Sequence, residues 1–206
     1  MTDKAGKERT RGRPREFDRD RALRDALRVF WSQGYLNTTM AQLCEAMGIK
    51  SPSLYCAFGC KADLFLEALE YYREAYWREA FARFMAEPDI RAATANLFRE
   101  TARILLLPDA PCGCLTVYTA LTLPASETRV LNAISVLRRD TKKMFRAKLM
   151  AALKDGQLPV TANIPAIAGA LTNFFEGLTL QARDDLCLAE LTEIAALGAR
   201  LLPEKA

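Results

Sequence analysis

The sequence of 206 residues contains no histidine. Because histidine is the most common general base and metal ligand near neutral pH, its absence removes the usual Ser–His and Cys–His catalytic pairs and leaves any zinc site dependent on cysteine. A glycine-rich phosphate loop and paired carboxylates at a readable spacing are also missing. The composition therefore argues against an enzyme, and we predict neither a metal site nor a cofactor.

Long apolar runs are absent as well. No stretch of 18 or more apolar residues occurs, and the basic N-terminus is followed by polar sequence. The sequence therefore predicts neither a membrane span nor a secretory signal, and a cytoplasmic protein is expected. The six cysteines are irregularly spaced, so they are expected to be free thiols rather than a disulfide framework.

Two short helices around a glycine turn form the most informative local pattern. Thr39 is suited to cap the first helix, and Ser51 is a natural N-cap for the second, with Pro52 at its first position. Leu54 and Phe58 are four residues apart and are expected to point inward together. With a further amphipathic helix upstream over residues 18–33, the pattern predicts a small three-helix domain containing a helix-turn-helix, whose second helix reads DNA.

Residues 1–15 carry six basic and two acidic side chains, a balance of +4 that equals the formal net charge of the whole chain. Arg11, Arg13 and Arg15 lie in a thin segment that is expected to enter an A·T-rich minor groove, where the negative potential is enhanced. A solvated tail is the alternative interpretation. The other 191 residues hold 23 basic and 23 acidic side chains, which argues against a protein that coats DNA without sequence preference.

These motifs resemble the tetracycline-repressor-like (TetR) family of bacterial regulators. The resemblance is strong over about residues 12–70. Over the rest of the chain it rests only on the general layout of the expected helices. The matching segments are 12–18, 30–35, 38–40, 46–49 and 51–61, followed by Leu64 and Phe65. The resemblance implies a homodimeric, all-α repressor that binds double-stranded operator DNA and leaves it when a small molecule or a covalent modifier reaches the larger C-terminal domain.

By position, the resemblance implies that Thr39, Tyr55 and Lys61 hold DNA phosphates. The residues that it places at base edges are Lys50, Ser51, Pro52 and Ser53. Cys60 stands where the family usually has a small acidic or amide residue that caps the fourth helix. Because such a cap contributes about 1 kcal/mol, the fourth helix is expected to begin less firmly here.

We predict an all-α fold of about nine helices, in which a long helix over residues 62–85 joins the reading domain to a larger ligand-binding and dimerisation domain. The expected organisation is a basic arm over 1–15, a helix-turn-helix domain over 16–61 and an effector-binding and dimerisation domain over 62–206. The further helices are expected over 89–107, 113–121, 126–154, 164–184 and 188–202.

The helix expected over residues 164–184 is too apolar to face water on its outer side. Pairing with the same helix of a second chain would bury it, and we predict that Leu171, Phe175 and Leu178 lie in this dimer interface. The alternative is that these side chains pack only within the monomer. Dimerisation also suits DNA reading, because half-sites about 34 Å apart need two reading helices.

Two cysteines, Cys112 and Cys114, lie at the start of the helix expected over residues 113–121. The positive end of a helix dipole favours a thiolate, and hence chemistry with electrophiles, oxidants or soft metals. In a subset of the resembling family a Gly-Cys-Leu segment stands at this place, as Gly113 to Leu115 do here. The alternative is that both cysteines are small buried hydrophobic side chains.

A noncovalent effector is the competing hypothesis for regulation. It would be a small, largely apolar molecule held among the helices that follow residue 90, with a few polar contacts. Its candidate contacts are Asn96, Arg103, Tyr118, Asn173, Phe174 and Glu176.

Overall fold

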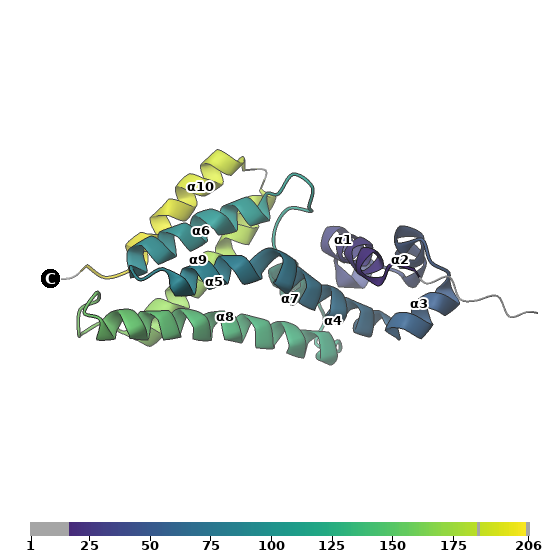
Figure 1. Cartoon of the computed structure of the whole chain (residues 1–206), viewed down its shortest axis with the longest axis horizontal. Helices are drawn as coiled ribbons and strands as arrows, with labels where there is room; N and C mark the ends of the chain where they lie inside the picture. Colours follow the sequence, from purple (N-terminus) through teal and green to yellow (C-terminus); the bar gives the residue numbers. More distant parts are fainter. Residues whose placement is uncertain (1–16, 185, 205–206) are drawn as a thin grey trace, which may run out of the picture.

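The computed structural model describes residues 17–184 and 186–204 and is elongated (Figure 1). All of its regular elements are helical over these residues, which confirms the predicted all-α class. The elements are α1 (Arg19–Asn37), α2 (Met40–Met47), α3 (Ser51–Phe58), α4 (Lys61–Tyr72), a π-helical turn (Arg73–Trp77), α5 (Arg78–Ala86), α6 (Ile90–Leu105), α7 (Leu115–Thr122), α8 (Thr128–Lys154), α9 (Ile164–Arg183), α10 (Leu188–Leu197) and a 3₁₀ turn (Gly198–Leu201).

Helices α1 to α3 lie at one end of the molecule (Figure 1). The carboxylate of Asp18 caps α1 by accepting from the backbone N–H of Arg21 at 3.0 Å. Thr39 caps α2 as predicted: its hydroxyl accepts from the backbone N–H of Gln42 at 3.2 Å, and the Gln42 amide oxygen accepts from the Thr39 backbone N–H at 2.8 Å. This reciprocal pair satisfies two backbone donors at the helix start.

The start of α3 differs from the prediction by one residue. Lys50, not Ser51, is the N-cap, because its backbone is extended and its carbonyl accepts from the N–H groups of Ser53 and Leu54 at 2.9 and 3.0 Å. Ser51 is therefore the first helical residue and Pro52 the second, where a missing N–H costs nothing. Leu54 is buried and points inward as expected.

The expected helix over residues 62–85 is present as α4, the π turn and α5, which run on without a break in the chain path. The weaker start expected at Cys60 stays a prediction. The Asp63 carboxylate reaches back to accept from the Cys60 backbone N–H at 3.0 Å and from the Cys60 thiol at 2.9 Å. Asp63, the third helical residue, thus satisfies the backbone donor of the cap residue.

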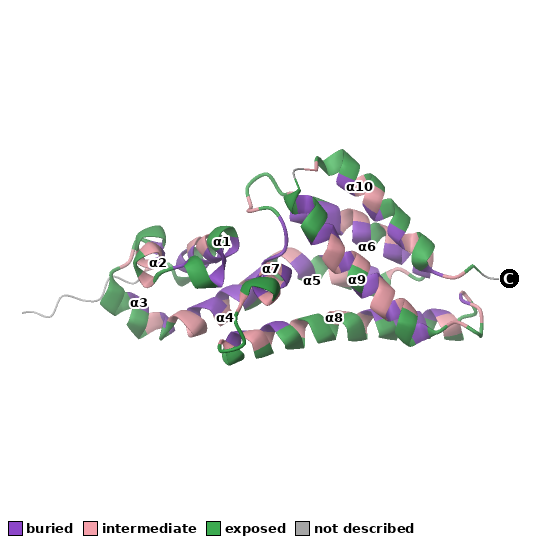
Figure 2. Cartoon of the chain, turned by 180° about the vertical axis from the view of Figure 1, so that it is seen from behind, coloured by how far each residue is buried: buried purple, intermediate pink, exposed green. Residues whose placement is uncertain are grey.

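The larger part of the fold is a bundle of α5 to α10 around an aromatic core. Phe145 of α8 packs edge-on against Phe84 of α5 with ring centroids 5.4 Å apart, and against Phe175 of α9 at 6.1 Å. Exposed residues follow the outer side of α8, and buried residues line the inner sides of the neighbouring helices (Figure 2). No helix among the described residues is both long and apolar enough to cross a membrane.

The predicted dimer-interface residues lie inside this core. Leu171, Phe175 and Leu178 have only 0%, 8% and 2% of their surfaces exposed in a single chain. Their placement in the interface is wrong, because the apolar face of α9 on which they lie packs against α6 and α8 of its own chain.

Candidate DNA-reading surface and effector cavity

The N-terminal end of α3 presents the predicted reading residues at the tip of the molecule (Figure 1). Tyr55 has 51% of its surface exposed. The other exposed members of this set are Thr39, Lys50, Ser51, Pro52 and Ser53. Each of these side chains is therefore accessible to solvent at the reading end of the molecule. Arg11, Arg13 and Arg15 lie outside the described residues.

Lys61 is only partly accessible at this edge. Its ammonium donates to the carbonyl of Leu36 at 3.3 Å and lies 4.4 Å from the centre of the Tyr35 ring. Burial lowers the pKa of Lys61, while the Glu127 carboxylate acts in the opposite direction. The side chain braces the end of α1 in this structure, and its phosphate contact stays a prediction.

A polar cluster joins the start of α8 to the reading end of the molecule. Arg129 pairs with the Asp63 carboxylate. Burial, reinforced by the Glu127 carboxylate, raises the pKa of Tyr35 to about 12. Glu127 and Arg129, at the start of α8, thus lie beside Tyr35 of α1 and Asp63 of α4.

The ionisation of Asp63 gives this cluster a testable pH dependence. Hydrogen bonds from the Cys60 thiol, the Cys60 backbone and Arg129 lower the Asp63 pKa from 3.8 to about 2. The ionised carboxylate therefore stabilises the folded state fully above pH 3.8, and this contribution is lost as the pH falls toward about 2. We expect the free energy of unfolding of Asp63→Asn, measured with urea, to fall less steeply between about pH 5 and pH 2 than that of the unsubstituted protein. The same dependence of unfolding free energy on pH in both proteins would contradict the lowered pKa of Asp63.

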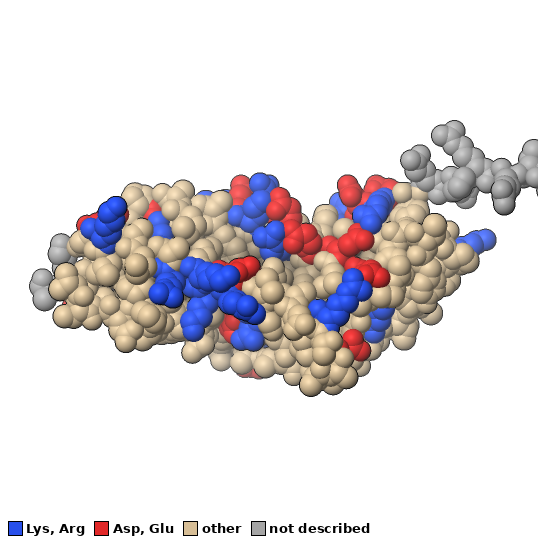
Figure 3. All heavy atoms as spheres, turned by 90° about the horizontal axis from the view of Figure 1, so that it is seen from below, with Lys and Arg blue, Asp and Glu red and all other residues tan. Residues whose placement is uncertain are grey.

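Basic side chains also gather far from the reading edge. Figure 3 shows Lys and Arg clustered over the face to which α8 contributes. In the middle of α8 the exposed basic residues are Arg138, Arg139, Lys142, Lys143 and Arg146. Residues 16–206 are neutral overall, but the larger bundle therefore carries a local positive surface.

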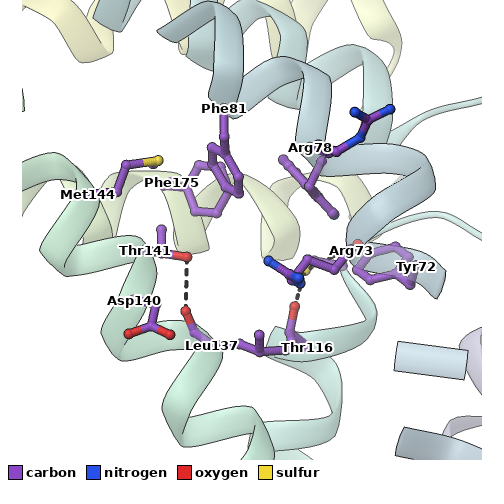
Figure 4. Close-up of a pocket in the computed structure, with 12 residues that line it drawn as sticks. Tyr72, Arg73, Arg78, Phe81, Thr116, Leu137, Asp140, Thr141, Met144 and Phe175 are labelled. Atoms are coloured by element: carbon purple, nitrogen blue, oxygen red, sulfur yellow. Dashed lines mark hydrogen bonds between the residues drawn. The ribbon is translucent and has the colours of Figure 1, made fainter. Parts of the chain in front are cut away.

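A cavity of about 330 Å³ opens between the π turn, α5, the start of α7, α8 and α9 (Figure 4). Its apolar walls are Trp77, Phe81, Leu137, Met144 and Phe175. Two arginines at the cavity are already paired with carboxylates: Arg73 with Glu70 at 2.5 Å and Arg78 with Glu74 at 2.6 Å. The cavity therefore suits a small, largely apolar and uncharged molecule.

Cys114 is the N-cap of α7, lies in the wall of this cavity and is 4% exposed. Its sulfur accepts from the Tyr72 hydroxyl at 3.4 Å and lies 2.9 Å from the Thr116 hydroxyl. Burial, followed by the proximity of Cys114, raises the pKa of Tyr72 well above its ordinary value, so Tyr72 remains a proton donor. Cys112 is exposed and does not line the cavity. The two predicted cysteines thus occupy different environments.

The candidate contacts for a noncovalent effector do not meet in one site, and their grouping is wrong. Asn96 and Arg103 line a separate surface hollow between α5 and α6. Glu176 pairs with Arg138 at 2.5 Å. Phe174 packs on a neighbouring aromatic ring, Asn173 faces solvent on α9, and Tyr118 lies under the guanidinium of Arg183.

Sequence reasoning missed Tyr72 and Trp77 as cavity residues. Tyr72, Trp77 and Phe81 follow one another at spacings of five and four residues. A regular α-helix does not place residues five apart on one face, but the π turn at Arg73–Trp77 does so by adding a residue to the turn. The spacing of five was the signal in the sequence.

Comparisons with known proteins agree on the class. A family model for bacterial regulatory proteins of the tetR family matches residues 22–68. The HTH-type transcriptional repressor ComR of Escherichia coli (strain K12) is 31% identical over 197 residues, covering 95% of this chain and 94% of the relative. The HTH-type transcriptional repressor BdcR of the same strain is 41% identical over 64 residues, which are 31% of this chain and 32% of that relative.

A solved structure resembles the whole chain. The TetR family regulator CifR, crystallised as a cysteine mutant with 26-base-pair operator DNA, is 36% identical, has a TM-score of 0.88, and is matched over 93% of this chain and 100% of that chain. The fold and the exposed reading helix define a helix-turn-helix transcriptional regulator, which is not an enzyme. The chain belongs to the TetR family of bacterial regulatory proteins.

Proposed function

We propose that the protein is a homodimeric repressor that is released from its operator when an effector enters the cavity beside Cys114, with modification of that thiol as the trigger. The observation that carries the proposal is the place of Cys114, which is both the N-cap of α7 and part of an apolar cavity wall. The proposed organisation is a basic arm over 1–15, a reading domain over 16–61 and an effector domain over 62–206.

Repression is supported by the relatives. ComR and BdcR are named as repressors, and CifR was crystallised on operator DNA. The exposed edge of α3 matches what direct readout requires, because a recognition helix contacts base edges with its N-terminal residues. Thr39 and Tyr55 are exposed as well and would hold phosphates, which set the register of the protein on the duplex.

A homodimer is supported by the outer side of α9. Ala166, Asn173 and Leu180 are spaced seven residues apart and are all exposed. Beside them, a Cβ added to Gly177 would meet no atom of the chain within 4 Å. This stripe is suited to close approach by a helix of a second copy, which replaces the interface first predicted from the buried side of α9.

The chemistry of the cavity favours a soft, uncharged electrophile. An α,β-unsaturated carbonyl compound would add the Cys114 thiol across its double bond: a sulfur–carbon bond forms, the π bond breaks, and the thiol proton ends on the α-carbon. No co-reactant is needed. Oxidation of the thiol, soft-metal binding and a noncovalent ligand in the same cavity are the alternative triggers.

Substitutions at the reading edge test the DNA-binding part of the proposal. We expect Lys61→Ala to weaken binding to all sequences and to reduce the slope of log affinity against log salt by about 1, because one phosphate contact is lost. Ser53→Ala should instead change base preference. Affinities for the DNA upstream of its own gene and for random duplexes, measured over a range of salt, separate these effects.

Lys154→Ala is the matched control, since Lys154 is an exposed lysine at the far end of α8. It should leave both affinity and salt slope unchanged. Equal losses on specific and random DNA from Ser53→Ala would remove Ser53 from the base contacts. No preference for any sequence would remove the repressor assignment itself.

A further inference from the structure

A buried hydrogen bond links α1, which belongs to the proposed reading domain, to the loop that carries Cys112 and Cys114. Trp31 lies on α1, is 2% exposed, and donates its indole N–H to the Gly113 carbonyl at 3.0 Å, across 82 residues of sequence. Gly113 is the residue directly before Cys114. Because α1 packs against α2 and α4, any displacement of Trp31 is felt by the elements that carry the reading helix.

The aromatic ring of Tyr72 forms a second connection between Trp31 and Cys114. The Trp31 indole packs edge-on against Tyr72, with centroids 4.8 Å apart and an interplanar angle of 76°. The hydroxyl of Tyr72 donates to the Cys114 sulfur at 3.4 Å. Trp31 thus contacts the backbone neighbour of Cys114 and also the side chain that holds its sulfur.

The loop has little freedom to move around these contacts. The Gly113 N–H donates to the Leu105 carbonyl at 2.9 Å, and its φ of +84° lies in the left-handed region. A Cβ added there would come within 3.2 Å of the Arg183 side chain. Trp31 is therefore two contacts away from the Cys114 sulfur, once through the Tyr72 side chain and once through the Gly113 backbone.

We infer that Trp31 is the positioning residue through which the state of the cysteine loop, residues 112–114, reaches the reading helices. This inference rests on the proposed function, in which an adduct at Cys114 is the trigger. With the loop unmodified, the Gly113 carbonyl holds α1 in the DNA-binding arrangement. With an adduct present, the hydrogen bond is lost, α1 shifts, and operator binding weakens.

Trp31→Phe tests the link, because phenylalanine keeps an aromatic ring beside Tyr72 but has no N–H donor. A net buried hydrogen bond corresponds to roughly a fivefold change in an equilibrium constant. We expect unmodified Trp31→Phe to bind its operator about fivefold more weakly, and its further loss on reaction with methyl vinyl ketone to be about fivefold smaller than that of the unsubstituted protein. Tyr76→Phe is the matched control, since it keeps the ring that packs on Trp31 at 5.1 Å and does not contact Gly113 through a hydrogen bond.

Fluorescence provides a readout that a merely structural role would not move. The chain has two tryptophans, so Trp77→Phe leaves Trp31 as the single emitter. Its emission should shift when mass spectrometry shows that Cys114 has reacted, and should not shift when Cys112 alone has reacted.

The outcomes separate the inference from the function on which it rests. Equal fold-losses in Trp31→Phe and the unsubstituted protein, with unchanged Trp31 emission, overturn the role of Trp31 and leave the thiol-triggered repressor standing. Complete reaction at Cys114 without any loss of operator binding in the unsubstituted protein overturns both. Smaller loss in Trp31→Phe, with unchanged behaviour of Tyr76→Phe, supports the link.

Discussion

Gly177→Arg is expected to convert the protein from a dimer to a monomer and to lower operator affinity by about two to four orders of magnitude, because two linked reading heads bind far more tightly than one. The chain itself has room for the new side chain, since a Cβ at Gly177 meets nothing within 4 Å. In the dimer the arginine would stand between two copies of α9. Sedimentation and operator titration of the same samples measure both effects.

Folding of the Gly177→Arg chain must be shown to be intact. Glycine is unfavourable inside a helix by about 1 kcal/mol relative to alanine, so the substitution should not lower the urea midpoint of the monomer. Leu197→Arg is the control, because Leu197 is 49% exposed on α10 and not on the α9 stripe. A Gly177→Arg protein that remains a dimer with full affinity would place the interface elsewhere.

Methyl vinyl ketone is expected to lower the operator affinity of the unsubstituted protein by up to about 100-fold, the upper range of typical coupling between two sites in a protein. The reagent is small and uncharged, so the apolar cavity beside Cys114 can admit it. Its addition fills space that Tyr72 and Thr116 share with the sulfur. Fluorescence anisotropy of labelled operator DNA measures the loss.

Butan-2-one is the matched control for this reagent. It has the same size and the same carbonyl but lacks the double bond to which a thiol adds. Loss of binding with methyl vinyl ketone alone indicates a covalent trigger, whereas equal loss with both ketones indicates a noncovalent ligand. If neither ketone weakens binding although Cys114 has reacted, the cavity is not the effector site.

Local rules predicted the reading end of the fold well. The Thr39 cap, the inward turn of Leu54 and the extents of the later helices follow from neighbouring residues, and the structure bears them out. The one-residue shift at Ser51 arose because the backbone of Lys50, rather than a side chain, begins α3. Such boundaries depend on cap geometry that side-chain preference alone does not fix.

The effector cavity and the interface were harder to predict because they depend on distant contacts. The apolar pattern of α9, which includes Leu171 and Leu178, is compatible both with a monomer core and with a dimer interface. In the structure this side of α9 packs against α6 and α8, so it belongs to the core. The link from Trp31 to Gly113 spans 82 residues and ends on a backbone carbonyl, for which no side-chain motif exists.

The central claim is that Cys114, and not Cys112, carries the signal from the cavity to the DNA. It is tested most directly by titrating operator DNA with Cys114→Ser and Cys112→Ser, each before and after treatment with methyl vinyl ketone. The account predicts that Cys112→Ser loses operator affinity on treatment as the unsubstituted protein does, and that Cys114→Ser keeps it. Loss of affinity in Cys114→Ser but not in Cys112→Ser would contradict the account, because the exposed thiol would then be the trigger.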